Sequence, residues 1–519
     1  MKASNYVIYV QLPDTDDYYL IHGYSGAVDK VTPEVVRFLL DRSDPALTWQ
    51  TRDQEIVRQS LESRHLGEVL PESVELLKQR GYLTEMSTEQ ERRYVERLAG
   101  FLHAKNLTGK PPAFMIVPIY DCNLRCPYCF ENDARVQLSK LAILKNVMTE
   151  AMADAAYDSM DILLRRRFPD RAEEDLKKLR RSITLYGGEP LMKETLPIIE
   201  YIVEKGVGKG YGFGAITNGV DLHHFVHLLG GKKITFLQIT LDGPIDVHDR
   251  KRIGPRHKNG TYDKILENVK AVLEQTNVRI SVRLHVDWNT IDRSKEVVED
   301  LTRRGLFEHK NFGIYGYPVH EFRKGDKPVP PLMAPYEVHK SFDRNPPSLN
   351  GSSKMAAPDD GIPPKLKQYM ERSLLGIYKA VEPCAATTGM YIFDPLGRIY
   401  SCWDTVGVAG LEVGAYSQAG PTLNELGATW LRRSPQQIDE CRNCKYAFFH
   451  FGGCSTLPLA YKGTIMAPAC YEYQENFIYV AGKFFKQGLH NAVKTQQAPL
   501  DEEEQTPEQD ARFVSEVQA

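Results

Sequence analysis

The chain lacks the features that would place it in a membrane, on a nucleic acid or in an oxidising compartment. It has no run of about 18 apolar residues, and its first five residues, MKASN, lack the apolar core of a signal peptide. The 65 Lys and Arg nearly balance the 68 Asp and Glu, so a strongly basic surface for nucleic acid is not expected. We therefore predict a cytoplasmic protein with neither membrane nor nucleic acid as a partner.

Cysteine is absent from the first 121 residues. The chain has nine cysteines, and six of them follow residue 380. An odd number with so uneven a distribution does not favour a disulfide framework, and a cytoplasmic chain keeps its thiols reduced. We therefore interpret the cysteines as ligands of metal or of iron–sulfur clusters.

Three of these thiols form the cysteine triplet, Cys122-x3-Cys126-x2-Cys129. The triplet follows an apolar run, 113–120, that is typical of a buried strand, so we expect it at a strand's carboxyl end, where α/β barrels place their chemistry. A cubane cluster normally takes four thiolates, so three leave one iron open to a substrate or cofactor. A zinc knuckle or a set of free thiols fits less well, because structural zinc takes four closed ligands.

Strand and helix patterns alternate from residue 113 to about 320. A long helix is predicted from about 139 to 168. Six such steps imply a parallel sheet, open or partly closed into a barrel, whose carboxyl strand ends form one rim. The predicted strands are 113–120, 183–186, 213–217, 234–241, 278–286 and 311–316.

Polar turns follow three of these strands at the rim. The Gly-Gly-Glu-Pro turn, 187–190, offers two glycines that allow close approach to a ligand, and Glu189 offers a carboxylate to an ammonium group. Thr217-Asn218-Gly219 follows the third strand, and TLDGP, 240–244, ends the fourth. Each turn alone is compatible with a simple loop, but their succession behind the cysteine triplet favours a shared site.

Together these motifs resemble the radical S-adenosylmethionine (radical SAM) superfamily. The resemblance implies a catalytic 4Fe–4S cluster on the cysteine triplet and S-adenosylmethionine on its open iron. The segment QITLDGPIDVHDRKR, 238–252, resembles the maturase branch, in which Asp242 is a candidate catalytic residue, although this segment is equally compatible with a structural loop network. The positions that the resemblance assigns to S-adenosylmethionine are Tyr128, Gly187, Gly188, Glu189, Pro190, Thr217, Asn218, Thr240 and Arg283.

Residues 1–108 are predicted to form a winged-helix-like module and a linking helix. Strands are expected at 6–10, 18–21 and 82–84, and helices at 32–40 and 71–80. A capping box at 87–90 opens a helix to about residue 105. The segments YYLIHGYSGAV and LLKQRGYLT resemble the peptide-recognition domain of ribosomal-peptide maturases. The alternative is a generic dimerisation or packing module.

The remaining six cysteines lie between residues 384 and 470. In isolation the last four are compatible with a zinc site, but beside the cysteine triplet they favour auxiliary iron–sulfur clusters. Their order resembles the SPASM domain of peptide-modifying radical enzymes, which implies one or two auxiliary 4Fe–4S clusters. That resemblance groups the cysteines into an inner set (Cys384, Cys402 and Cys454) and an outer set (Cys441, Cys444 and Cys470).

Two positions in this region depart from the SPASM pattern. His450 stands where that pattern has a cysteine, and it either replaces the thiolate, as histidines do in Rieske centres, or lies beside the cluster as a bystander. In related sulfatase maturases an aspartate directly after the second SPASM cysteine acts as a base. Here Trp403 takes that position, and Asp404, one residue later, is the candidate catalytic residue.

The predicted fold class is therefore α/β. It combines a partial (β/α)6 radical SAM barrel with an N-terminal winged-helix-like module and a C-terminal cysteine-rich SPASM domain. The predicted boundaries are 1–108 for the module and linking helix, 109–320 for the barrel, 321–365 for a linker or flap, 366–480 for the SPASM domain and 481–519 for a polar, acidic tail.

The resemblance implies an enzyme that matures a ribosomally made peptide. It would cleave S-adenosylmethionine reductively and use the 5′-deoxyadenosyl radical to form a thioether or carbon–carbon cross-link, with an auxiliary cluster taking the surplus electron. The implied partners are a precursor peptide or small protein and an electron donor of the flavodoxin or ferredoxin type. One alternative is maturation of a protein active site, such as sulfatase formylglycine or amine dehydrogenase cross-links. Another is a zinc-stabilised binding protein.

Overall fold

The structure is a computed structural model. The predicted linker or flap at 321–365 and nearly all of the predicted tail, 481–519, lie outside the residues that it describes. The described residues are 1–12, 15–44, 51–62, 64–129, 131–179, 182–255, 257, 259–318, 384–470 and 473–485 without 476, 480, 483 and 484.

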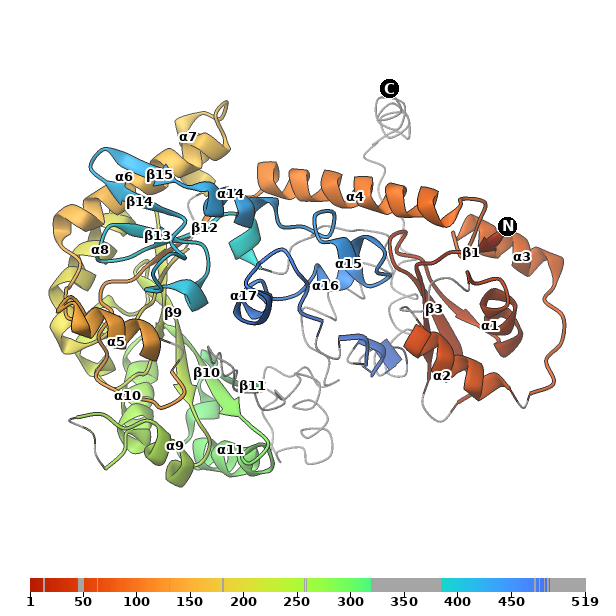
Figure 1. The fold of residues 1–519 in the computed structure, drawn as a ribbon. Helices are drawn as coiled ribbons and strands as arrows, with labels where there is room; N and C mark the ends of the chain where they lie inside the picture. Colours follow the sequence, from red (N-terminus) through yellow and green to blue (C-terminus); the bar gives the residue numbers. More distant parts are fainter. Residues whose placement is uncertain are drawn as a thin grey trace.

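A ten-stranded sheet forms the centre of the larger part of the molecule (Figure 1). Six neighbouring strands are parallel, and each overlaps one predicted strand, so the predicted parallel α/β sheet is confirmed. The first strand ends at Ile116, four residues before its predicted end. In spatial order the six are β6 (Ala113–Ile116), β7 (Ser182–Leu185), β8 (Gly212–Thr217), β9 (Ile234–Leu241), β10 (Arg279–Val286) and β11 (Phe312–Pro318).

Helices between these strands cover the outside of the sheet (Figure 1). The apolar faces of α6, α8 and α10 pack on the strands in one continuous core. None of the described helices combines the length and the apolar character that a membrane crossing needs. The helices are α5 (Asn132–Lys140), α6 (Glu150–Arg167), α7 (Glu173–Leu179), α8 (Leu196–Gly208), α9 (Ile245–Lys251), α10 (Tyr262–Gln275) and α11 (Ser294–Arg303).

The single helix predicted from about 139 to 168 is wrong, because the chain is broken between α5 and α6. Ala142 has a φ of 58°, a left-handed conformation that ends α5. The backbone N–H of Met148 donates to the carbonyl of Pro118 at 2.8 Å, which holds the segment between α5 and α6 against the loop that follows β6. The side chain of Thr149 then caps α6 by accepting from the N–H of Met152 at 3.2 Å.

The same sheet continues into the C-terminal cysteine-rich region, which the sequence did not predict. β12 (Met390–Phe393) pairs parallel with β6, so that Ile392 lies opposite Met115. The hydroxyl of Tyr120 also donates to Asp394 at 2.7 Å, just beyond β12. The cysteine-rich region is therefore fixed to the strand that leads into the cysteine triplet. Its other elements are β13 (Arg398–Tyr400), β14 (Gly414–Ser417), β15 (Gly420–Leu423), α14 (Glu425–Arg432), α15 (Asp439–Arg442), α16 (Ala447–His450) and α17 (Thr456–Lys462).

The N-terminal module contains a three-stranded antiparallel sheet and three helices. The predicted strands at 6–10 and 18–21 and both predicted helices are confirmed within one or two residues, whereas β4 and α2 were not predicted. A separate two-stranded ribbon joins β1 to β5. The elements are β1 (Lys2–Ala3), β2 (Val7–Gln11), β3 (Tyr18–His22), β4 (Val28–Val31), α1 (Pro33–Leu40), α2 (Thr51–Leu61), α3 (Pro71–Gln79) and β5 (Leu83–Thr84).

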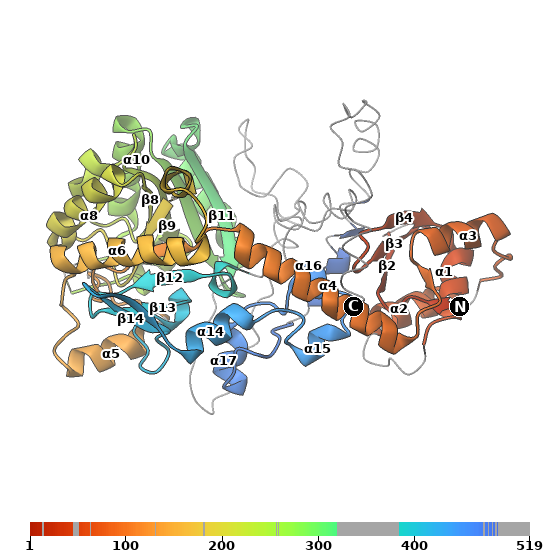
Figure 2. The ribbon, with the colours of Figure 1, turned by 90° about the horizontal axis from the view of Figure 1, so that it is seen from above.

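A long helix, α4 (Thr88–Gly109), runs from this module along the cysteine-rich region toward the sheet (Figures 1 and 2). The predicted capping box of Ser87 and Gln90 opens it. One face of the module's sheet packs on the cysteine-rich region through an apolar cluster that includes Ile8, Tyr446 and Phe449. The cysteine-rich region therefore lies between the module and the six parallel strands.

Candidate active site

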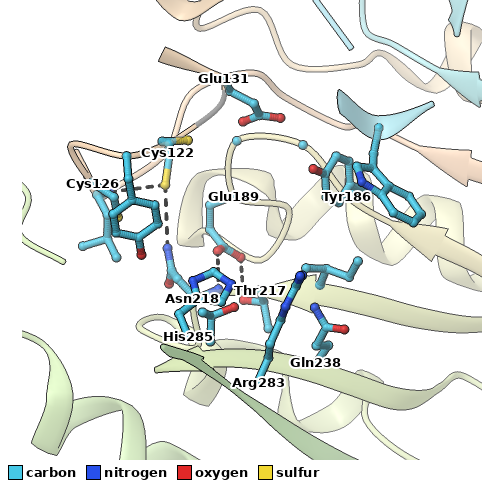
Figure 3. Close-up of a pocket in the computed structure, with 18 of the residues that line it drawn as sticks. Cys122, Cys126, Glu131, Tyr186, Glu189, Thr217, Asn218, Gln238, Arg283 and His285 are labelled. Atoms are coloured by element: carbon cyan, nitrogen blue, oxygen red, sulfur yellow. Dashed lines mark hydrogen bonds between the residues drawn. The ribbon is translucent and has the colours of Figure 1, made fainter. Parts of the chain in front are cut away.

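A cavity of about 390 Å³ lies between the carboxyl ends of the parallel strands and the cysteine-rich region. Figure 3 shows the side chains that converge on it. The strand ends supply one wall, as expected for the rim of such a sheet. The predicted site residues that line the cavity are Cys122, Cys126, Tyr128, Cys129, Gly187, Gly188, Glu189, Thr217, Asn218, Thr240, Arg283, Asp404 and Cys454.

The cysteine triplet is held in a buried environment. Burial raises the pKa of all three thiols, that of Cys129 to about 12. Such thiols become thiolates only when a positive group such as iron is bound to them. Among the described residues no three His, Cys, Asp or Glu side chains converge tightly enough for a single metal ion. Three cysteines on one loop fit a cluster of several irons, in which each iron takes one thiolate.

The Gly-Gly-Glu-Pro turn is packed against the segment that leads into the cysteine triplet. Gly187 has a φ of 123°, and a Cβ at Gly188 would lie 2.2 Å from the carbonyl oxygens of Tyr120 and Asp121. The N–H of Glu189 donates to the carbonyl of Asp121 at 3.0 Å. The two glycines therefore allow a close approach to the chain's own backbone, whereas the sequence suggested an approach to a ligand.

Glu189 is the buried carboxylate at the end of this turn. Its oxygens accept from the hydroxyl of Thr217 at 2.5 Å and from the N–H groups of Asn218 at 2.6 Å and Leu191 at 2.9 Å. Burial raises its pKa to about 7. A carboxylate held by neutral donors at the cavity wall fits an ammonium group. The carbonyl of Pro190 accepts from Thr195 at 2.7 Å, so this residue shapes the turn.

Arg283 lies on the same wall as Glu189, and its guanidinium is suited to bind the carboxylate of a ligand (Figure 3). Its buried Nε has no hydrogen-bond partner among the described residues, and its guanidinium lies 3.7 Å from the ring centre of Tyr317. A buried donor without a partner favours binding of an acceptor from a ligand. Arg283 and Thr240 face each other on paired strands, so the predicted contacts with S-adenosylmethionine fall on one surface.

Tyr128 and Asp242 form a buried network behind the cysteine triplet. The Tyr128 hydroxyl donates to Asp242, which also accepts from Arg252 at 3.0 Å and lies 3.2 Å from Nδ1 of His285. Burial alone would raise the pKa of Asp242, but Arg252 and His285 lower it well below its usual value. His248, on α9, completes the network through a contact with the Asp242 N–H at 3.4 Å. This geometry favours a positioning role for Asp242 over the predicted catalytic one.

Asp404 lies on the opposite wall of the cavity, in a short 3₁₀ turn, Trp403–Thr405, of the cysteine-rich region. Its carboxylate accepts from the hydroxyl of Thr456 at 3.1 Å. Burial raises its pKa to about 6. Unlike Asp242 it faces the cavity, so its placement is compatible with the predicted catalytic role.

The neighbours of two C-terminal cysteines are compatible with the two predicted sets. Burial raises the pKa of Cys402. The negative charges that raise this pKa further are those of Asp404 and of the other two members of the inner set, Cys384 and Cys454. Burial also raises the pKa of Cys441. The charges of the other two members of the outer set, Cys444 and Cys470, raise this pKa further. Each set therefore provides three thiols, which fits a cluster with a fourth, different ligand.

His450 lies at the end of α16 with its ring stacked on Tyr473, 4.0 Å between ring centres. Burial and, to a smaller extent, the charge of Arg433 lower its pKa to about 4. A neutral imidazole is the form that binds metal. Its role as an iron ligand stays a prediction.

The cavity also contains side chains that the sequence analysis missed. Gln238 lies two residues before Thr240 on β9, and His285 lies two residues after Arg283 on β10. The two-residue period of a strand could have identified both. Tyr317, Trp403 and Glu131 also line the cavity, and the sequence carries no comparable signal for them.

Comparisons with known proteins agree with this geometry. Residues 116–301 match the model of the radical SAM superfamily. The chain is 24% identical over 176 residues to a cysteine-type anaerobic sulfatase-maturating enzyme of Clostridium novyi (strain NT), a match that covers 33% of this chain and 42% of that enzyme. The chain thus matches less than half of that relative's length.

Two solved structures share the fold. Native anSMEcpe with bound AdoMet has a TM-score of 0.52 and 16% identity, covering 74% of this chain and all of that one. The same enzyme with AdoMet and the Cp18Cys peptide has a TM-score of 0.50 and 14% identity, covering 74% of this chain and 99% of that one. With its cysteine triplet at the rim of a matching fold, residues 116–301 form a radical SAM domain, the domain that uses S-adenosylmethionine and a 4Fe–4S cluster in this superfamily.

Proposed function

We propose that the chain modifies a ribosomally made peptide by radical chemistry. The observation that carries this proposal is the two-sided cavity. The cysteine triplet and the S-adenosylmethionine-binding positions line one wall, and Trp403, Asp404 and Leu457 line the other. A substrate residue between the walls is within reach of both. When bound, the cofactors supply a one-electron route to a radical that removes hydrogen from a substrate carbon.

The chain's own residues hold and orient the reactants. Glu189 would receive the ammonium group of S-adenosylmethionine, and Arg283 would receive its carboxylate. Tyr128 would lie beside the adenine, and its hydrogen bond to Asp242 limits the rotation of its ring. Fixed groups of this kind convert binding energy into orientation at the reacting atoms. The apolar side chains of Trp403 and Leu457 help to exclude water.

Asp404 is proposed as the residue that accepts a proton from the substrate as the new bond forms. It is a carboxylate on the substrate side of the cavity, and Thr456 fixes its orientation. Proton transfer requires a base within hydrogen-bond reach of the substrate. Asp242 lacks that access, because its oxygens are engaged by Tyr128, Arg252 and His285.

The cysteine-rich region is proposed as a SPASM domain that holds two auxiliary 4Fe–4S clusters. The inner set and the outer set each supply three thiols, and His450 is the proposed fourth ligand of the outer cluster. Clusters held there would supply an acceptor for the electron that remains when the substrate radical closes its bond. The electron that starts the reaction would come from a cytoplasmic donor of the flavodoxin or ferredoxin type.

The N-terminal module is proposed to bind the peptide outside the cavity. Within the described residues β4 pairs only with β3, so its other edge can accept an extended peptide as a further strand. Arg80, at the end of α3, binds Asp29 of β4 at 2.8 Å, which places the helix beside that edge. Leu76 on α3 is 55% exposed and offers an apolar contact to such a peptide.

Maturation of a protein active site is the second candidate function. It is favoured by the similarity of 176 residues of the chain to a sulfatase-maturating enzyme and by the fold shared with anSMEcpe. In both functions the substrate is a polypeptide, and anSMEcpe was solved with a bound peptide. The two functions differ in the product, a cross-link or a formylglycine.

The test is to incubate the reduced, iron-loaded chain with S-adenosylmethionine and each of two substrates. One is the peptide encoded by a neighbouring short reading frame, and the other is a peptide that carries a sulfatase active-site cysteine. A peptide that loses two hydrogen atoms, with 5′-deoxyadenosine released, supports the first function. An aldehyde in place of the thiol supports the second. If neither peptide is changed although 5′-deoxyadenosine forms, the proposed substrate class is wrong.

A matched pair of variants tests the binding surface. Leu76→Glu places a charge on α3 beside the β4 edge and should weaken peptide binding at least tenfold. Ile56→Glu makes the same change at a similarly exposed position on α2, and it should have no effect. Fluorescence anisotropy of a labelled peptide measures both. Equal affinities of the two variants would favour the alternative that the module only packs against the cysteine-rich region.

A further inference from the structure

Arg433 is a buried arginine that has no carboxylate partner among the residues that the structure describes. It directly follows α14, and only 1% of its surface is exposed. Its Nε donates to the carbonyl of Ile465 at 2.6 Å, and its Nη2 donates to those of Gly452 at 3.1 Å and Ala467 at 3.2 Å. Nη1 lies 3.5 Å from the carbonyl of Phe451. No Asp or Glu of the described chain forms an ion pair with it.

This arrangement leaves a full positive charge without compensation. A guanidinium keeps its proton inside proteins, and an isolated buried charge is costly unless an opposite charge lies near it. Carbonyl dipoles satisfy the N–H groups of Arg433, but they carry no net charge. The surroundings of Arg433 should therefore contain a negative group, which the described carboxylates do not supply.

The groups that surround Arg433 are cysteine thiols from both C-terminal sets. The thiols whose charges act on it are Cys441 and Cys470 of the outer set and Cys384 and Cys454 of the inner set. A Cβ placed on Gly452 would lie 3.3 Å from Nη2 of Arg433 and 3.5 Å from Sγ of Cys441. The guanidinium of Arg433 and the sulfur of Cys441 thus both lie close to Gly452.

We propose that Arg433 is the shared counter-cation of the two auxiliary iron–sulfur clusters. The inference rests on the proposed function, since it requires those clusters. A 4Fe–4S cluster bound by thiolates is an anion, and its net charge is one of the factors that set its reduction potential. Reduction adds one electron and no proton to the cluster. A buried cation beside it stabilises the reduced form, and so Arg433 raises the midpoint potential of both auxiliary clusters.

A purely structural role makes a different prediction. The four carbonyls that Arg433 contacts belong to residues 451, 452, 465 and 467, so it also holds two loops together. If this were its only role, a substitution would lower the melting temperature and leave the midpoint potentials unchanged. Redox titration therefore separates the two roles.

The experiment compares substitutions in the full-length chain, loaded with iron and sulfide under anaerobic conditions. Arg433→Gln and Arg433→Met remove the charge, and Arg433→Lys keeps it. The matched control is Arg167→Gln, because Arg167 also binds the carbonyls of Leu107 and Thr388 but has only Tyr391 acting on its charge. Iron and sulfide per chain are measured first, and each cluster is then titrated by electron paramagnetic resonance.

We expect both neutral variants to lower the auxiliary midpoint potentials, while Arg433→Lys and Arg167→Gln stay close to the wild type. Added salt should not reduce the shift, because a buried charge is poorly screened. Loss of auxiliary iron in both neutral variants, but not in the lysine variant, would also support the inference. Unchanged potentials at full iron content would overturn it, and so would equal iron loss in all three Arg433 variants.

The wild-type iron content separates this inference from the proposed function. Iron for one cluster only would overturn both, because no auxiliary cluster would then exist. Iron for three clusters with unchanged potentials in the neutral variants would overturn the role of Arg433 and leave the proposed function standing.

Discussion

The cysteine triplet and the C-terminal cysteines lie in different electrostatic surroundings. Near the triplet two buried cations have carboxylate partners, since Arg252 binds Asp242 at 3.0 Å and Arg135 lies 3.7 Å from Asp121. Among the C-terminal cysteines Arg433 has no such carboxylate within the described part of the chain. Within the described residues, carboxylates therefore offset part of the positive charge near the triplet, whereas none pairs with Arg433.

This difference corresponds to the roles that we propose for the clusters. A cluster that must give an electron to S-adenosylmethionine benefits from a low potential. A cluster that must take an electron from a substrate radical benefits from a higher one. Net charge and hydrogen bonding are among the means by which a protein sets these potentials. The comparison predicts that changes at the two regions will have separable effects.

The largest effect is expected from Cys126→Ala. This change removes one of three ligands of the catalytic cluster, so 5′-deoxyadenosine formation should fall to background. The six C-terminal cysteines remain, and the protein should keep auxiliary iron and a brown colour. Chromatography of 5′-deoxyadenosine and an iron assay measure both. A wild-type rate of formation under dithionite would show that the triplet is not the catalytic site.

Cys402→Ala tests the other side of the comparison. The inner set loses a ligand, and peptide modification should fall at least a hundredfold, because the surplus electron has no acceptor. Cleavage of S-adenosylmethionine without peptide should change only a few-fold, since the triplet is intact. Mass spectrometry of the peptide and 5′-deoxyadenosine release separate the two activities. A parallel loss of both would mean that the two regions are not functionally distinct.

Asp242→Asn tests the paired charges behind the triplet. Breaking a buried ion pair leaves Arg252 without its partner and costs about 3–5 kcal/mol. We expect a lower melting temperature and weaker S-adenosylmethionine binding, because Tyr128 loses its charged acceptor, while auxiliary potentials stay unchanged. Calorimetry and the redox titration measure these. Arg250→Gln, which breaks an exposed pair with Asp246, is the control and should cost less than about 1 kcal/mol.

The smallest effect is expected from His450→Cys. If His450 ligates the outer cluster, a thiolate in its place adds negative charge and lowers the midpoint potential of that cluster alone, as comparison of Rieske and plant-type centres indicates. His450→Ala should lose iron or open the cluster to added thiol. Wild-type iron content and potentials in both variants would show that His450 only stacks on Tyr473.

The sequence predicted those parts of the site that short motifs carry. The cysteine triplet, the 187–190 turn and the Thr217-Asn218 turn lie at the ends of strands whose apolar runs are easily identified, and all three reach the cavity. A local pattern suffices there, because each strand places the residues that follow it on the rim. The assignment of the C-terminal cysteines to two sets came from a resemblance, and the thiol neighbours agree with it.

The long-range contacts could not be predicted. β12 has only four residues, and more than half of the chain's length separates it from its partner β6 in the sequence. No local sequence pattern therefore predicts this pairing. Arg433 is one of many arginines until the fold brings four of the six C-terminal cysteines near it. The sequence also could not show which of the two candidate catalytic aspartates reaches the cavity. Only the fold shows that Asp404 faces the cavity and that Asp242 does not.

The pairing of β12 with β6 fixes the position of the cysteine-rich region relative to the cysteine triplet. The pairing is parallel and extends from Met390 beside Ala113 to Phe393 beside Ile116, and it is continued by the bond from the N–H of Val117 to the carbonyl of Phe393. A hinge that swung the cysteine-rich region away would break this hydrogen-bonded ladder. The proposed catalytic and auxiliary clusters would therefore keep a constant separation. Because electron transfer slows steeply with distance, a constant separation would keep the rate of electron transfer between them the same in every turnover.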